Sequence, residues 1–201
     1  MPTSCLSAET QIAMHLTLDQ EKTLLDIAWA SIEHGLRQRN PLDVDPTRYE
    51  SGLQLLGASF VTLRIEHDLR GCIGALAATR PLVVDVAQHA YAAAFCDPRF
   101  APLNAEELPQ LTLHISVLSP SSPVAFESEE VLARILRPGV DGLTIAYGRY
   151  RATFLPAVWH SIADPNEFIR QLKTKAGLAP TVQDYQAWRY MTIEFSSADE
   201  P

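Results

Sequence analysis

Two apolar strands separated by a three-residue turn constrain the fold of this chain more than any other feature. Residues 60–65 and 69–76 alternate β-branched or apolar residues with others, and Glu66-His67-Asp68 lies between them. A parallel pair of strands needs a crossover of about a dozen residues or more, so these two strands must form an antiparallel hairpin. Any fold that this chain adopts therefore contains an antiparallel sheet.

Helical and strand patterns follow one another along the rest of the chain without a regular strand–helix–strand rhythm. Apolar spacing predicts helices at about 18–39, 79–95 and 129–136, and another from Asp164 to Gly177. Alternating residues predict further strands at about 111–118, 143–147, 150–155 and 189–195. This mixture predicts the α+β class, with a mainly antiparallel sheet flanked by helices.

Residues that commonly begin and end helices support these boundaries. Thr17 and Gln20 predict a capping box at the start of the first helix. Thr79 is the expected N-cap of the second helix. Asp164 predicts the start of the last helix, and Gly177 predicts its end.

Size and charge limit the classes of protein to which this chain can belong. With 201 residues, 47% of them hydrophobic, it can bury one sizeable core, so we expect a single domain at 17–196. A partly ordered leader at 1–16 precedes this domain and a tail at 197–201 follows it. The net charge of -8 argues against general nucleic-acid binding and against docking on anionic membranes. The basic residues are mostly arginine, which favours a local site for carboxylate or phosphate.

The cysteines and the N-terminus predict a cytoplasmic protein. Cys5, Cys72 and Cys96 form no C-x-x-C pair and are odd in number, a pattern typical of reduced proteins rather than of disulfide scaffolds. Residues 1–8 have no basic start and no long apolar run, so we expect no secretory signal. The sequence contains no run of the roughly 20 apolar residues that a membrane helix needs.

The segment Leu69-Arg-Gly-Cys-Ile-Gly74 is the first candidate for chemistry. On a regular strand Arg70, Cys72 and Gly74 share one face, and Gly74 would leave room for a ligand beside the sulfur. Arg70 would favour the thiolate of Cys72, which makes Cys72 the candidate nucleophile or redox thiol. The alternative is structural, because a free cysteine is often a buried filler and the glycines can mark a bulge or close packing on the alanine-rich helix.

The segment Asp97-Pro98-Arg99-Phe100, directly after the alanine-rich helix, is the second candidate. Arg99 can complement the negative end of that helix and pair with Asp97, which is a local structural role. Alternatively, Arg99 and Arg70 converge as a fork that binds a carboxylate or a phosphate. Arg149 and Arg151 on a predicted hairpin are a third, weaker candidate, because arginines on hairpins are usually solvated.

Common metal and cofactor signatures are absent from the sequence. The six histidines include no i,i+4 pair and no zinc-type partnership with the cysteines. The chain has no P-loop, no dinucleotide fingerprint and no G-x-S-x-G elbow. We therefore expect no metal and no cofactor.

A series of short motifs resembles the signature of one family. In chain order the motifs are Phe60-Val-Thr-Leu63, Leu69-Arg-Gly-Cys-Ile-Gly74, Thr79-Arg-Pro-Leu82, Ala93-Ala-Phe95, Asp97-Pro-Arg-Phe100, Glu107-Leu-Pro109, Ser116-Val-Leu-Ser-Pro120, Arg137-Pro-Gly-Val-Asp-Gly-Leu143, Arg151-Ala-Thr-Phe-Leu-Pro156 and Lys175-Ala-Gly177. Over residues 18–196 the chain resembles the AMMECR-one domain family, and more narrowly its bacterial form called AmmeMemoRadiSam system protein A.

The resemblance implies an α+β fold with a larger sheet-and-helix lobe and a smaller lobe. It also implies Memo-like and radical SAM proteins as partners, although the family has no established biochemical role. Three hypotheses follow: an accessory protein that binds a small anionic or nucleotide-like ligand, an enzyme that uses Cys72, or an interaction scaffold. The candidate ligand-binding residues are Arg70, Gly71, Gly74, Asp97 and Arg99.

Overall fold

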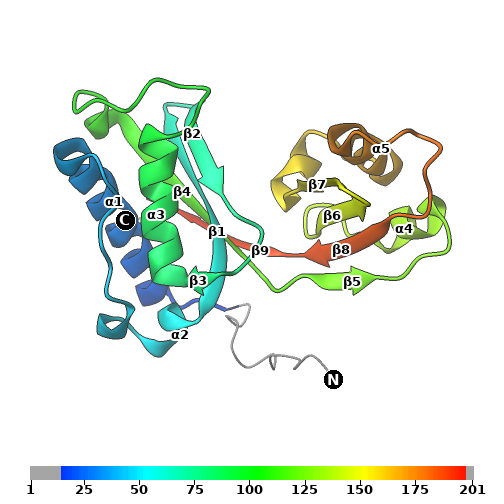
Figure 1. Ribbon diagram of the computed structural model, residues 1–201, viewed down its shortest axis with the longest axis horizontal. Helices are drawn as coiled ribbons and strands as arrows, with labels where there is room; N and C mark the ends of the chain where they lie inside the picture. The colour runs from blue at the N-terminus through cyan, green and yellow to red at the C-terminus, as the bar shows by residue number, and fades with distance from the viewer. Residues whose placement is uncertain (1–14, 198–201) are drawn as a thin grey trace. The chain divides into compact units, whose positions relative to one another are not determined.

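The computed structural model describes residues 15–197, which form two compact units (Figure 1). The smaller unit is Ser119–Thr192, and the larger unit combines the chain up to Leu118 with the segment that returns at Ile193. Most of the expected leader and most of the expected tail lie outside the described residues. The division into leader, single domain and tail stays a prediction.

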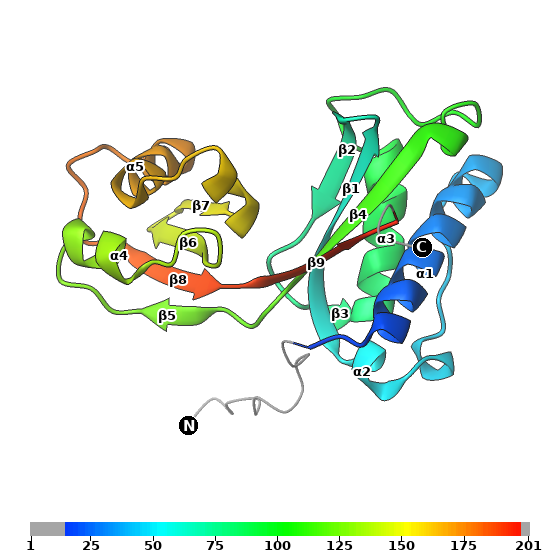
Figure 2. The same ribbon diagram turned by 180° about the vertical axis from the view of Figure 1, so that it is seen from behind.

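The larger unit is a five-stranded sheet packed against two long helices (Figures 1 and 2). Its main strand order is β2-β1-β4-β9, and β1 pairs antiparallel with both β2 and β4. One hydrophobic core joins the two helices to the inward side chains of β1 and β4. The elements are α1 (Leu18–Gln38), η2 (Pro46–Arg48), α2 (Ser51–Gln54), β1 (Leu56–Ile65), β2 (Asp68–Gly74), β3 (Arg80–Pro81), α3 (Leu82–Phe95), η3 (Leu108–Gln110), β4 (Leu111–Leu118) and β9 (Thr192–Ser196).

Local residues explain how α1 begins, and a sheet contact explains why α3 begins late. Thr17 caps α1 and forms the expected capping box with Gln20. The expected N-cap at Thr79 is wrong, because Arg80 and Pro81 pair with β1 as strand β3. Pro81 is therefore the residue that precedes α3.

The smaller unit is a four-stranded antiparallel sheet of order β5-β8-β6-β7 with its own hydrophobic core. Inside this core the rings of Trp159 and Phe168 are stacked with their centroids 3.8 Å apart. Helix α5 has the expected N-cap, Asp164, and it ends at Gly177, whose φ of 75° suits a glycine. The elements are β5 (Ser122–Val124), α4 (Glu129–Ile135), β6 (Gly142–Tyr147), β7 (Tyr150–Phe154), η4 (Pro156–His160), α5 (Pro165–Ala176) and β8 (Gln186–Tyr190).

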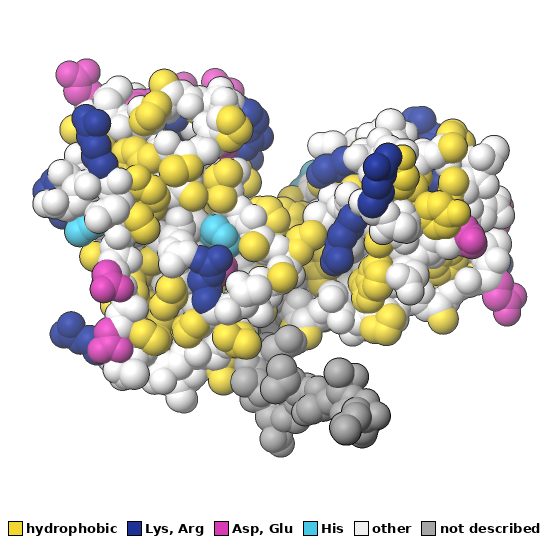
Figure 3. Space-filling model, in the orientation of Figure 1, with side chains coloured by type: hydrophobic (Ala, Val, Ile, Leu, Met, Phe, Trp, Pro, Cys, Tyr) yellow, Lys and Arg dark blue, Asp and Glu magenta, His cyan; other side chains and the backbone are white. Residues whose placement is uncertain are grey.

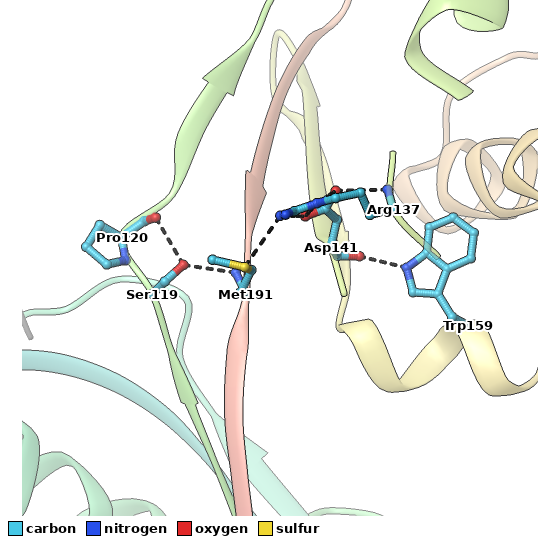
Figure 4. A network of polar contacts seen from close by, with 6 residues as sticks. All are labelled: Ser119, Pro120, Arg137, Asp141, Trp159 and Met191. Atoms are coloured by element: carbon cyan, nitrogen blue, oxygen red, sulfur yellow. Dashed lines mark hydrogen bonds and ion pairs between the residues drawn. The ribbon is translucent and has the colours of Figure 1, made fainter. Parts of the chain in front are cut away.

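A buried carboxylate orders the loop that leads into β6 (Figure 4). The side chain of Asp141 is fully buried and accepts hydrogen bonds from the backbone nitrogen and the guanidinium of Arg137. The backbone oxygen of Asp141 accepts a 2.7 Å hydrogen bond from Trp159 Nε1. These contacts tie the loop to η4, and Arg137 also reaches the sulfur of Met191 at 3.4 Å.

The expected fold class, α+β with antiparallel sheets flanked by helices, is confirmed. The strand expected at 189–195 is in fact two strands, because Met191 leaves the ladder and its flanking segments join different sheets. Within residues 15–197, none of the helices combines the length and the apolar character that crossing a membrane requires.

Candidate functional site

Strand β2, at the edge of the larger sheet, carries Cys72 and a bulge. Cys72 lies opposite Thr62 and Gly71 opposite Leu63, but the next residue of β1, Arg64, lies opposite Leu69. Arg70 is therefore an extra residue without a partner on β1. The bulge breaks the regular alternation that placed Arg70 on one face with Cys72 and Gly74, so that expectation is wrong.

The side chain of Cys72 lies in a row across three strands. Thr62 Oγ1 donates a hydrogen bond to Cys72 Sγ at 3.2 Å. Thr62 also lies opposite His114 of β4, on the other side from Cys72. Since Val61 and Leu63 point into the core, Thr62 and its two neighbours lie on the face away from α1 and α3. Cys72 is partly buried there.

The backbone of Cys72 is held by two side chains from the segment after α3. Its nitrogen donates to Asp97 Oδ2 at 2.9 Å, and its oxygen accepts from Arg99 Nη2 at 3.3 Å. The Asp97 side chain is only 2% exposed, and Arg99 donates to both of its oxygens, from Nε at 2.9 Å and from Nη2 at 2.6 Å. The Arg99 guanidinium, together with the backbone N–H groups of Cys72 and Arg99, holds the pKa of Asp97 well below its ordinary value.

Arg70 is committed to a partner that the sequence interpretation missed. Its Nε and Nη2 donate to the two oxygens of Glu107 at 2.6 and 3.0 Å, and Nη2 also donates to the Ala101 oxygen at 3.0 Å. This pairing lowers the pKa of Glu107. Arg70 Nη1 is buried and finds no hydrogen-bond partner among the described residues. The only sequence signal for Glu107 is its place in the family motif Glu107-Leu-Pro109.

Arg70 and Arg99 both lie near one aromatic ring, but only one of the two guanidinium groups is accessible to a ligand. Their guanidinium carbons lie 5.9 and 5.5 Å from the ring centroid of Phe100. Each guanidinium is paired with its own carboxylate, however, so the two do not form an empty fork. The Arg70 side chain is 13% exposed and that of Arg99 is 53% exposed. Arg99 is the one of the pair that a ligand can reach.

The two glycines of the segment serve close packing. A Cβ on Gly71 would lie 2.1 Å from the backbone oxygen of Ala93 in α3. A Cβ on Gly74 would lie 2.3 Å from Phe60 Cγ and 2.5 Å from the Ser59 oxygen. The room that we expected beside Gly74 is thus filled by the Phe60 ring.

The third candidate group belongs to the smaller unit, where Figure 3 shows Lys and Arg side chains gathered on one face. Arg149 lies over the ring of Tyr150 at 5.3 Å, and Arg151 lies over the ring of Trp188 at 5.6 Å. No carboxylate pairs with either arginine among residues 15–197. No group of three or more His, Cys, Asp or Glu residues in that range is arranged to hold a metal ion.

Comparisons with known proteins place these features in a family context. A family model described as AMMECR1, the AMMECR-one domain, matches residues 25–195. A protein from Methanothermobacter thermautotrophicus is 37% identical over 170 residues, which cover 82% of this chain and 86% of the relative. A protein from Thermotoga maritima is 33% identical over 172 residues, which cover 84% of this chain and 94% of the relative.

A solved structure has a similar fold. It is the crystal structure of an uncharacterized protein from Pyrococcus horikoshii, which has a TM-score of 0.77 and 30% sequence identity. The similarity covers 86% of this chain and 89% of that one. The descriptions of these relatives name no activity, ligand or partner.

Proposed function

We propose that this chain, which belongs to the AMMECR1 family, is an accessory protein that binds a small anionic or nucleotide-like ligand at Arg99, next to Cys72. The family consists of uncharacterised proteins without an established role, so the proposal depends on the geometry of the larger unit. The observation that carries it is a half-exposed guanidinium fixed in place by a buried carboxylate.

Fixing Arg99 in advance favours the binding of an anion. Asp97 holds Nε and Nη2, so the guanidinium keeps one orientation while its side chain stays 53% exposed. A ligand then orders little protein when it binds, which lowers the entropic cost of association. The ring of Phe100 beside Arg99 offers apolar contact to a ligand with a flat body, such as a nucleobase.

Arg70 supports this site as a positioning residue. Its bonds to Glu107 and to the Ala101 oxygen fasten the segment after α3 onto the bulge of β2. Gly71 lets β2 approach α3 closely, and Asp97 joins Cys72 to Arg99. Loss of Arg70 should therefore weaken binding through a displaced Arg99.

The wider setting of the proposal comes from the resemblance of the motifs to AmmeMemoRadiSam system protein A. We place the protein in the cytoplasm, beside Memo-like and radical SAM proteins. Gel filtration of the purified chain mixed with each partner from the same genome tests this association. Independent elution of all three proteins at micromolar concentration would count against it.

Calorimetric titration of the full chain with AMP and with inorganic phosphate tests the ligand site. We expect Arg99→Gln and Arg70→Ala to lose binding, whereas Cys72→Ser keeps it because no sulfur contact is needed. Arg48→Gln, a change at an exposed arginine of the same unit, is the matched control and should bind normally. Circular dichroism confirms that each variant is folded. Affinity that survives both the Arg99 and the Arg70 substitution would refute the proposal.

A second candidate function is an enzyme with Cys72 as nucleophile or redox thiol. The hydrogen bond that Thr62 donates to the sulfur favours it, because such a bond stabilises the thiolate. His114 lies beyond Thr62 in the same row, two strand spacings of about 4.8 Å from Cys72, which is too far for it to act directly as the base of a nucleophile.

The rate of alkylation of each cysteine as a function of pH tests this second candidate. Exposure alone predicts that Cys96, which is exposed, reacts faster than the partly buried Cys72. An enzyme requires the opposite order of rates. The alkylation rate of Cys72 should then reach its plateau at a pH well below about 8.5, which is the typical pKa of a free thiol. Labelling of Cys72 only after denaturation would exclude the enzyme.

A further inference from the structure

A buried polar cluster lies where the first two turns of α3 meet β1. Its centre is Asp85, whose side chain is fully buried. Asp85 Oδ2 accepts hydrogen bonds from the backbone nitrogen of Ser59 at 2.9 Å and from Ser59 Oγ at 2.8 Å. The same oxygen lies 3.1 Å from His89 Nδ1, one helical turn further along α3. The cluster belongs entirely to the larger unit and shares no residue with the Arg99 site.

The surroundings of His89 determine which of its ring nitrogens carries the proton. Nδ1 faces Asp85 Oδ2 and also Ser59 Oγ, which lies 3.3 Å away and donates its own proton to Asp85. Both neighbours of Nδ1 therefore accept hydrogen bonds, so Nδ1 is the protonated nitrogen of the neutral ring. Nε2 is then left with its lone pair, and within residues 15–197 it has no hydrogen-bond partner. The side chain of His89 is 10% exposed.

Arg80, at the start of this cluster, has hydrogen-bonding capacity that the described part of the chain does not use. Its Nε lies 3.4 Å from Asp85 Oδ1, which is an ion pair but not a hydrogen bond. Asp85 Oδ1 is itself buried and without a hydrogen-bond partner in that part of the chain. The Arg80 side chain is only 35% exposed, yet none of its five N–H groups donates to a described residue. The Arg80 N–H groups, on a side chain that keeps partial access to the surface, therefore remain available to an acceptor other than the described residues.

We propose that Arg80 and His89 form a second ligand site, which binds a small oxyanion, either a phosphate or a carboxylate. The planar guanidinium of Arg80 donates two hydrogen bonds to the oxyanion. His89 Nε2 contacts the same ligand, accepting from an O–H group when the ring is neutral and donating when it is protonated. Asp85 is the positioning residue, because it fixes the orientation of the imidazole through Nδ1.

A purely structural role explains only part of the cluster. A carboxylate near the start of a helix is stabilised by the helix dipole, and this accounts for Asp85. It does not account for Arg80, whose side chain is about two-thirds buried and whose N–H groups donate to no described residue. It also does not account for His89 Nε2, which has no hydrogen-bond partner among those residues.

The second site is independent of the site at Arg99. Asp85 lies ten residues before Phe95 on α3, or about 15 Å along the helix axis, and Arg99 lies beyond the end of that helix. Asp85 of α3 pairs with both His89 and Arg80, and these three residues differ from the residues of the Arg99 site. Arg99→Gln should therefore leave the second site intact.

NMR titration of the histidine rings of the full chain tests the second site. The pH titration is recorded with inorganic phosphate, with acetate and with chloride alone, all at one ionic strength. A bound anion stabilises the imidazolium, so we expect the midpoint of His89 to move to higher pH by at least about half a unit. The exposed His67 and His160 serve as internal references and should stay in place. A response to phosphate alone or to acetate alone identifies the ligand class.

Substitutions complete the test. Arg80→Gln should abolish the anion-dependent shift of the His89 midpoint. Arg80→Lys keeps the charge but not the planar guanidinium, so it should reduce the shift, and it provides the test should the glutamine variant fail to fold. Arg48→Gln is the control for a lost surface charge and should respond as the wild type does. The proposal is overturned if, with both anions, the titration midpoint of His89 shifts no more than the midpoints of the two reference histidines. A full response in the Arg80 variants would overturn it as well.

Discussion

Replacing Gly71 with alanine should destabilise the larger unit. The new Cβ would lie 2.1 Å from the backbone oxygen of Ala93 and 3.0 Å from its carbonyl carbon. Both atoms belong to the backbone of α3, so no side-chain rotation can relieve the clash. Either β2 or α3 must move by about 1.3 Å to restore an ordinary contact of 3.4 Å.

The expected cost of this movement is about 3 kcal/mol. Overpacking a core typically costs about 1–3 kcal/mol, and a clash between two backbones belongs at the upper end of that range. The shift would also stretch the bond from the Cys72 nitrogen to Asp97, which adds to the cost. Because every 1.4 kcal/mol is a factor of ten, the opening equilibrium of the larger unit should rise by roughly 100-fold.

Native-state hydrogen exchange measures this change separately for each unit. Amides of β1 and β4 should exchange roughly 100-fold faster in Gly71→Ala, whereas those of β6 should not change. Gly52→Ala is the matched control, since its Cβ would meet only the end of the flexible Gln20 side chain at 2.9 Å. An acceleration below about tenfold in β1 and β4 would refute the packing argument.

Three further predictions concern buried polar groups. Asp97→Asn should destabilise the protein at neutral pH in urea unfolding. The pKa of Asp97 is lower in the folded than in the unfolded protein, so the ionised carboxylate stabilises the fold above the unfolded-state pKa, and this stabilisation is lost as the pH falls toward the folded-state pKa. The difference in unfolding free energy between variant and wild type should therefore shrink below about pH 4, and a difference independent of pH would contradict this. Burial and, next to it, the Glu129 carboxylate raise the pKa of Tyr185, but the distance and angle of a hydrogen bond to its hydroxyl are not met by any described residue. Tyr185→Phe should therefore be neutral or stabilise β8 by up to about 1 kcal/mol in hydrogen exchange, and a clear loss of stability would show that Glu129 does bond the hydroxyl. Arg137→Met should accelerate hydrogen exchange in β6, because Asp141 then stays buried without its guanidinium partner. Unchanged exchange would show that the backbone alone satisfies Asp141.

Elements whose signals lie within a few residues could be predicted from the sequence. The capping box of Thr17 and Gln20, the N-cap Asp164 and the strand at 111–118 are confirmed, because each depends only on neighbouring residues. The antiparallel hairpin that carries Cys72 is confirmed, but its turn is shorter than expected: it consists of Glu66 and His67 alone, because Asp68 already pairs with Ile65 as the first residue of β2. The functional roles of the candidate residues stay predictions.

Features that depend on distant residues could not be predicted. Glu107 is 37 residues from Arg70, and no local pattern links the two. The bulge at Arg70 changes which side chains share a face, and strand periodicity assumes that no such residue is inserted. Asp85 and His89 are one helical turn apart and recognisable as neighbours, but the contact with Ser59 depends on how α3 packs against β1.

The side chains that hold the backbone of Cys72 have a consequence for how this protein behaves in a crowded solution. An outer strand of a sheet normally offers unpaired N–H and C=O groups, to which a strand of another molecule can add. At Cys72 both outward groups are already occupied, the nitrogen by Asp97 and the oxygen by Arg99. These two side chains close the strand to self-association at Cys72, so Asp97→Ala should expose unpaired backbone groups at the edge of the sheet and promote intermolecular β-pairing.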